Sequence, residues 1–192
     1  MVKNLIQMLI RVGVLTLCLM IGVGPFTDVR ADTVGEYTVK AALVLNLARF
    51  TDWPADAFAD SKDAIVLYIV GDDAAGDAFA SIEGRSIGGR RLVIKRMRRT
   101  RQLKGCHLLF VGGSDRSRLP KLFAAVDGRP VLTIGEMKGF AGSGGIVNLI
   151  KKGSKIRLQV NLGNAQRAGL KISSRILKLA TIVNGSQGEE RK

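Results

Sequence analysis

An α/β domain built on a mixed sheet is the fold that this sequence predicts, and three features of its pattern indicate it. Short, wholly apolar runs such as residues 64–70 are typical of central strands covered on both faces. Segments with helical character separate these runs, which favours strands joined by crossovers. Late in the chain, two strand-like runs flank a short turn and predict an antiparallel hairpin. The expected architecture is therefore a single domain, a mixed β-sheet flanked by helices.

The first half of the domain is expected to alternate helices with strands. Thr33 and Glu36 form a capping-box pattern, and the apolar segment behind them predicts a buried helix that Trp53-Pro54 stops. Asp115 is expected to cap a helix reaching Ala125. Between these helices the sequence predicts strands at residues 64–70, 91–97 and 106–111, with a short helix around residues 74–80.

The second half is expected to contain a short strand, the hairpin and two helices. Asn161 is expected to cap a short helix that Gly169 ends, and Ser173 or Ser174 to cap a final helix through about Val183. The predicted strands are residues 130–134, 145–150 and 155–160, the last two joined across residues 151–154. Residues 184–192 are polar and are expected to form a flexible tail.

The first 31 residues resemble a cleaved secretory signal peptide. Lys3 and Arg11 supply positive charge, residues 12–23 an apolar run, and Val29-Arg30-Ala31 a small-residue cleavage site, so cleavage is expected after Ala31. Two alternatives are a retained anchor, for which the apolar run is too short, and lipidation at Cys18, which Leu17 disfavours. Cleavage would leave 161 of the 192 residues, with the domain at residues 32–183 and a periplasmic location.

The chain is strongly basic, with a formal net charge of +14, or +12 without the leader. In an exported protein this charge points to anionic lipid, envelope polymers or an acidic protein face, whereas nucleic acid normally lies in another compartment. The densest cluster is a basic patch whose members are Arg90, Arg91, Lys95, Arg96, Arg98, Arg99, Arg101 and Lys104. Two interpretations of this patch remain open. It is either a strand and loop exposed to solvent, or a contact with an acidic partner or an anionic membrane surface. Because no aromatic residue interrupts the patch, single-stranded nucleic acid is not expected as a ligand.

The sequence gives little support for an enzyme. Cys106 is the only cysteine after the leader, so a free thiol is expected, either buried or in an intermolecular disulfide. The single histidine, His107, adjoins it in a predicted strand, where alternation directs the two side chains to opposite faces. We therefore expect no catalytic residues, no metal site and no cofactor. Near residues 111–115 a backbone anion site and a plain tight turn both remain open.

Five segments, taken in order, resemble the YfiR-like family of periplasmic regulators. They are residues 36–41, 50–54, 144–150, 156–161 and 167–180, and the resemblance covers residues 35–183. It implies an exported protein that binds the periplasmic sensor domain of a membrane-bound diguanylate cyclase and represses cyclic di-GMP synthesis, affecting biofilm formation and motility. It also implies a homodimer, and an outer-membrane peptidoglycan-binding lipoprotein that sequesters the inhibitor. Many relatives pair a cysteine in the first strand with one at the position of Cys106, but residues 65–70 contain none here.

Residues within the family segments are candidates for a partner or dimer surface, namely Arg49, Phe50, Trp53, Arg167 and Arg175. An aromatic residue beside an arginine at a helix end can anchor a protein interface. The alternative is that Trp53 only covers the core where the helix ends, and the same alternative applies to the arginines. Two other functions remain open: an accessory subunit for another membrane sensor such as a histidine kinase, and a basic module that binds anionic envelope polymers.

Overall fold

The computed structural model describes residues 29–59, 61–71, 73–97 and 103–184. The chain divides into two compact units, Met1–Asp32 and Thr33–Lys192, and the second unit contains the sheet. The predicted leader lies outside the described residues except for its last three, Val29-Arg30-Ala31, which belong to the first helix. The predicted tail also lies outside them from residue 185 onward.

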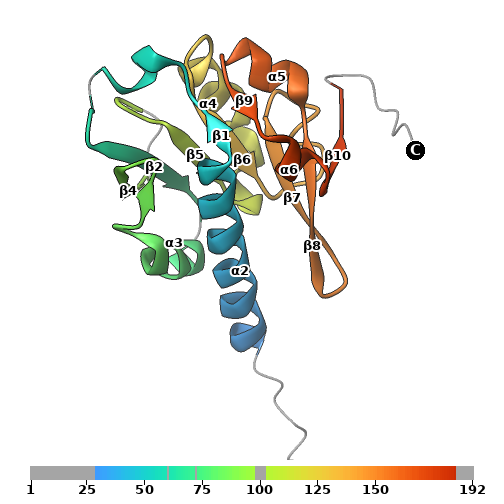
Figure 1. Cartoon of the computed structure of the whole chain (residues 1–192). Helices are drawn as coiled ribbons and strands as arrows, with labels where there is room; N and C mark the ends of the chain where they lie inside the picture. Colours follow the sequence, from blue (N-terminus) through green and yellow to red (C-terminus); the bar gives the residue numbers. More distant parts are fainter. Residues whose placement is uncertain (1–28, 60, 72, 98–102, 185–192) are drawn as a thin grey trace, which may run out of the picture. The chain divides into compact units, whose positions relative to one another are not determined.

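Helices are interspersed among the strands along the domain (Figure 1). The helices are α2 (Val29–Arg49), α3 (Asp73–Phe79), α4 (Leu119–Val126), α5 (Leu162–Arg167) and α6 (Ser174–Leu177), with 3-10 turns at Ala55–Phe58, Ala80–Ile82 and Gly113–Arg118. The strands are β1 (Thr51–Asp52), β2 (Ala64–Val70), β3 (Ser86–Ile87), β4 (Arg90–Arg96), β5 (Leu108–Val111), β6 (Leu132–Gly135), β7 (Val147–Lys152), β8 (Lys155–Val160), β9 (Lys171–Ile172) and β10 (Ala180–Ile182).

The main sheet has eight strands in the order β10-β8-β7-β6-β5-β2-β4-β3 and confirms the predicted mixed α/β class. Neighbours from β4 to β7 run parallel, while β7 and β8 form the predicted antiparallel hairpin. A short antiparallel pair, β1 with β9, lies outside this sheet and places Thr51 opposite Ile172. Crossovers therefore build the centre of the sheet and a hairpin extends it.

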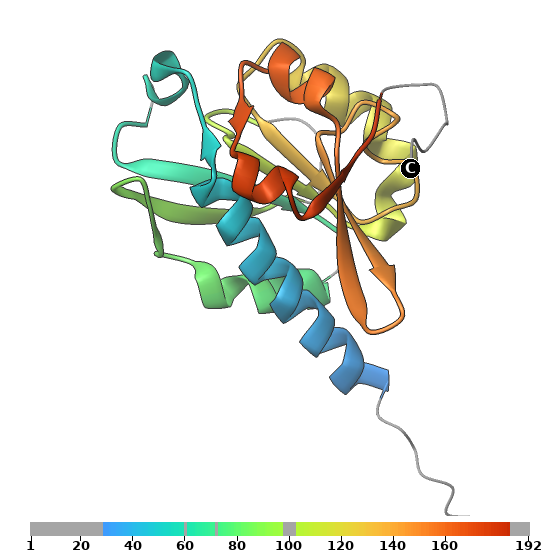
Figure 2. The same ribbon diagram turned by 45° about the vertical axis from the view of Figure 1, so that its right-hand side comes forward.

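Two hydrophobic cores lie on opposite faces of the sheet, because successive side chains of a strand point to opposite sides. Alternate residues of β2 show the division: Ile65, Leu67 and Ile69 pack with α2, α3, α5 and α6, whereas Val66 and Tyr68 pack with α4. In Figure 2 α2, α5 and α6 lie in front of the sheet and α4 lies behind it. The domain is thus a three-layer arrangement with the sheet in the middle.

The strand predicted at residues 106–111 begins only at Leu108, as β5, and three predictions about helix ends were also wrong. The helix α2 begins at Val29, so Thr33 lies inside the helix instead of capping its start. Asp115 does not cap a helix; it lies inside the 3-10 turn with non-helical φ and ψ, and its carboxylate accepts a bond from Arg118 at 2.9 Å. The final helix stops at Leu177, and Ala180–Ile182 instead form β10, which pairs in parallel with β8. The caps at Asn161 and Ser173 were predicted correctly.

Candidate functional site

A network of charged side chains, some of them deeply buried, lies where the central strands end. Lys40 on α2 forms ion pairs with Glu36 and with Glu136, the residue that follows β6. The side chains of Lys40 and Glu136 are only 6% and 5% exposed, so both charges are largely removed from water. The hydroxyl of Tyr37 donates to Glu136 Oε1 at 2.9 Å, and Lys151 Nζ lies 2.7 Å from Glu36 Oε2. We call these residues, Glu36, Tyr37, Lys40, Glu136 and Lys151, the charge network.

The charge network occupies the position where an open α/β sheet usually binds its ligand. The chain leaves β2 toward β4 on one side and returns to β5 on the other, so the topological switch point lies beyond the carboxyl ends of β2 and β5. Here that crevice is narrow. A Cβ added at Gly71 would lie 3.2 Å from the Cα of Gly112, so the two backbones approach closely. The backbone N–H of Gly113 donates to Glu136 Oε1 at 2.8 Å.

The turn at residues 111–115 therefore holds an anion that the protein supplies itself. The open choice between an anion site and a plain turn is settled by Glu136, which accepts the Gly113 amide. Burial alone would raise the pKa of Glu36, but hydrogen bonds from Lys151 and Lys40 outweigh it and hold that pKa below its ordinary value. Both carboxylates are thus paired, and we assign the charge network a structural role.

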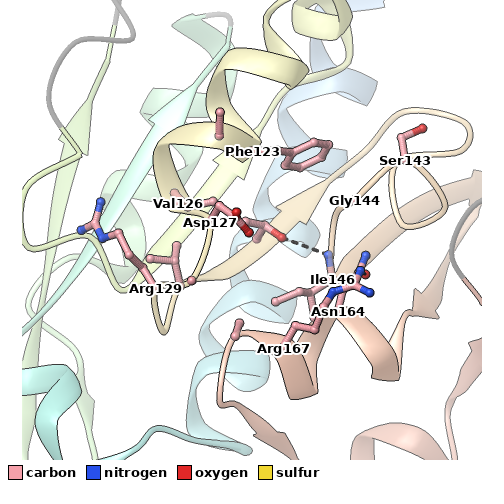
Figure 3. A pocket seen from close by; sticks show the side chains of 14 residues that line it. Phe123, Val126, Asp127, Arg129, Ser143, Gly144, Ile146, Asn164 and Arg167 are labelled. Carbon is pink, nitrogen blue, oxygen red and sulfur yellow. Dashed lines mark hydrogen bonds between the residues drawn. The ribbon is translucent and has the colours of Figure 1, made fainter.

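A separate cavity of about 300 Å³ lies between α4 and α5. Figure 3 shows Phe123 of α4 on one side of it and Asn164 and Arg167 of α5 on the other. Val131 and Ile146 contribute apolar side chains to its lining. Its volume is at the lower end of the range for small-molecule sites.

The buried polar groups of this cavity are engaged with the protein. Thr133 Oγ1 accepts the backbone N–H of Ile146 at 2.9 Å, the dashed bond of Figure 3. Asn164 Nδ2 donates to the carbonyl of Gly145 at 2.6 Å, and its Oδ1 accepts from Arg167. Arg129 turns its guanidinium outward to the Leu103 and Ala125 carbonyls. These bonds fix the cavity wall, and they do not bring a nucleophile and a base together.

Two of the five predicted surface residues, Trp53 and Arg167, lie near this cavity. Trp53 Nε1 donates to the carbonyl of Pro130 at 3.0 Å, and so holds the loop whose neighbours Arg129 and Val131 line the wall. Arg167 lines the cavity directly. Trp53 also packs against the core, which agrees with the alternative interpretation that it covers the core where the helix ends.

The other three predicted residues lie around the β1–β9 pair. The guanidinium of Arg175 lies 5.8 Å from the centre of the Phe50 ring, and the backbone of Ser173 bonds to the Phe50 carbonyl at 2.9 Å. Arg49, at the end of α2, reaches the Ser86 carbonyl at 3.5 Å. The structure therefore joins Phe50 and Arg175, whereas Arg49 points toward β3.

The basic patch is divided between two faces of the sheet. Arg90 stacks on the Phe58 ring at 3.8 Å and Lys95 lies over the Tyr68 ring at 5.6 Å. Arg96 forms an ion pair of 2.8 Å with Asp77. Arg91 and Lys104 are exposed, and Arg98, Arg99 and Arg101 lie outside the described residues. The described part of the patch is therefore not one continuous cationic surface.

Cys106 and His107 point to opposite faces, as alternation predicted. Cys106 packs in the core beneath α4, and burial raises the pKa of its thiol to about 12. His107 stacks on Phe58 with ring centres 4.8 Å apart. Its Nδ1 accepts the backbone N–H of Val66 at 3.1 Å, which leaves Nε2 to donate to the Ala57 carbonyl. Burial lowers the pKa of this imidazole, so it is held neutral.

Among the residues that the structure describes, no group of three or more His, Cys, Asp or Glu side chains is placed to hold a metal ion. Within the same residues, no helix has the length and apolarity needed to cross a membrane. Sequence reasoning missed the charge network, although Glu36 and Lys40 lie in one of the family segments. Their i, i+4 spacing was the available signal, but nothing local marks Glu136 as their partner.

Two comparisons with known proteins bear on this fold. The DUF4154 family, described as YfiR/HmsC-like, matches residues 37–181. A solved structure from Streptococcus pneumoniae, titled as an ABC domain in complex with L-Trp, is similar with a TM-score of 0.51 and 11% identity. The likeness covers 74% of this chain and 60% of the Streptococcus chain, so this chain spans less than two thirds of the length of that structure. At this identity the second match shows a shared fold only.

Proposed function

Because the chain belongs to the YfiR/HmsC-like family, we propose that it is a periplasmic inhibitor of an inner-membrane diguanylate cyclase. The family is regulatory and non-catalytic, and it acts in the periplasm. The match over residues 37–181 is the observation that carries the proposal. The cyclase would be repressed through its periplasmic sensor domain, with effects on biofilm formation and motility.

The inhibitor would act by preferring one state of its partner. A bound protein shifts a conformational equilibrium only when it binds the two states with different affinity. Converting a sensor from almost fully active to almost fully inactive requires a preference of about 10⁴-fold. A homodimer would present two equivalent surfaces to a dimeric cyclase, and an outer-membrane peptidoglycan-binding lipoprotein would relieve inhibition by capturing the inhibitor.

The proposal is tested by cellular cyclic di-GMP in a deletion strain. The strain is complemented separately with the full chain and with a leaderless chain that starts at Asp32, and cyclic di-GMP is measured by mass spectrometry. We expect a rise on deletion that only the full chain reverses. An unchanged level would contradict the proposal and favour another membrane sensor or an envelope polymer as partner. Rescue by the leaderless chain would contradict the periplasmic location.

A further inference from the structure

We propose that the free edge of β10 binds an extended, acidic segment of a partner protein, which adds to the sheet as a further strand. β10 is the terminal strand of the main sheet in the described part of the chain. Two large apolar side chains are exposed here: Leu179, just before the strand, at 75%, and Ile182, within it, at 40%. An edge strand presents unpaired backbone groups that another chain can join.

The backbone geometry determines which groups face outward. The N–H of Val183 donates to the Val160 carbonyl of β8 at 2.9 Å. Since the backbone groups of successive strand residues point to opposite sides, those of Ala180 and Ile182 point away from β8. These residues offer two N–H donors and two carbonyl acceptors to an incoming strand. The edge is short, so the flanking side chains must supply most of the selectivity.

Charge identifies the kind of segment that fits. Residues 137–188 contain no Asp or Glu. Beside β10 a cavity of about 390 Å³ is lined by Lys152, Arg157 and Lys178 together with Leu179. All three basic residues are exposed. An acidic segment would gain attraction from every one of them, and a basic or neutral segment would not.

The two faces of the sheet differ at this edge, and the difference defines an alternating pattern. By strand alternation Arg157 and Thr181 point to one face of the sheet, whereas Leu158 and Ile182 point to the face covered by α2. A paired strand would therefore place acidic side chains on the first face and apolar side chains on the second. A second copy of this chain is a poorer occupant, because antiparallel pairing of two β10 edges would bring like charges together.

The inference rests on the proposed function in one respect: we take the segment to belong to the periplasmic part of the membrane partner. Its first test does not need that partner. The probe is a blocked peptide in which Glu and Val alternate, titrated into the ¹⁵N-labelled protein and followed by amide chemical shifts. We expect the largest shifts at Ala180 and Ile182, and no binding of a peptide with Lys in place of Glu. Shifts centred elsewhere would overturn the proposal.

Variants separate the contributions of charge and backbone. Arg157→Glu with Lys178→Glu is expected to weaken peptide binding about tenfold. The matched control, Lys62→Glu with Lys121→Glu, carries the same net charge on exposed positions away from β10 and should bind normally. Ile182→Pro removes one outward N–H without touching the pairing with β8, and should weaken binding about fivefold while the melting temperature is retained. Equal losses in the two charge variants would show non-specific attraction and overturn the proposal.

Other occupants give distinct results. Binding of phosphatidylglycerol vesicles without binding of the peptide would make the surface a membrane contact. A dimer that Ile182→Pro converts to monomer, without peptide binding, would make it a contact between copies. In the deletion strain, Arg157→Glu with Lys178→Glu should fail to lower cyclic di-GMP, while the control pair should lower it. Full repression by that edge variant would refute the edge as the partner site and leave the proposed function intact.

Discussion

Replacement of Lys40 by Met tests the charge network most directly. The substitution leaves Glu136, 5% exposed, with the Tyr37 hydroxyl and Gly113 amide but without a cation. Removal of one partner of a buried pair costs about 3–5 kcal/mol, because the remaining charge stays desolvated. For a domain of this size each kcal/mol lowers the melting temperature by about 2–4 °C, so we expect a fall of about 10 °C.

The matched control is Lys151→Met. Lys151 also pairs with Glu36, but its side chain is 45% exposed, so its loss should cost less than about 1 kcal/mol. The double variant Lys40→Met with Glu136→Gln removes both charges and should cost at least about 1 kcal/mol less than the sum of its two single variants. Urea unfolding followed by the fluorescence of Trp53, the only tryptophan, supplies the free energies. Equal costs for Lys40→Met and Lys151→Met, or strict additivity in the cycle, would refute the reasoning.

Three further predictions follow from burial. The Cys106 thiol, with its pKa raised to about 12, should remain unmodified by maleimide at pH 8 in the native protein and react once urea unfolds it; rapid native labelling would contradict its burial. Because the folded pKa of His107 is lowered, the unfolded chain binds the proton more readily, so stability should be full above about pH 6.5 and decline below it. His107→Asn should flatten that decline in urea titrations, and an unchanged slope would contradict the assignment. Gly145→Ala should cost about 1–3 kcal/mol because the new Cβ would lie 2.1 Å from the Phe140 ring, whereas Gly163→Ala within α5 should be neutral or slightly stabilising; calorimetry of the two variants compares them.

The elements that local pattern controls could be predicted from the sequence. β2 matches its prediction at both ends, because a continuous apolar run ends at Gly71, whose φ is positive. The cap at Asn161 depends on the backbone amide of Asn164, three residues away, so it could likewise be predicted from the sequence. β10 was missed because Ala180–Ile182 gain their partner from β8, a tertiary contact that overrides the helical periodicity.

The candidate site was harder to predict from the sequence for the same reason. Glu136 is a lone acid without local pattern, and Lys40 lies 96 residues before it. Trp53 stood out as the single tryptophan, but its hydrogen bond to Pro130 crosses 77 residues. The opposite orientations of Cys106 and His107 needed only strand alternation, and that prediction was correct. Family segments thus identified important residues without indicating which of them meet.

The order in which these partners emerge from the ribosome has a consequence for folding. The Tyr37 hydroxyl bonds to Glu136, which lies 99 residues later in the chain, and Thr51 pairs with Ile172 of β9. These contacts of α2 and β1 therefore form only after most of the chain has been made, and such non-local closure slows folding. A chain interrupted before Lys171 would leave β1 without its strand partner β9. Until those late segments have been made, Tyr37 and Thr51 lack these contacts, so this part of the domain is less stable than in the finished fold.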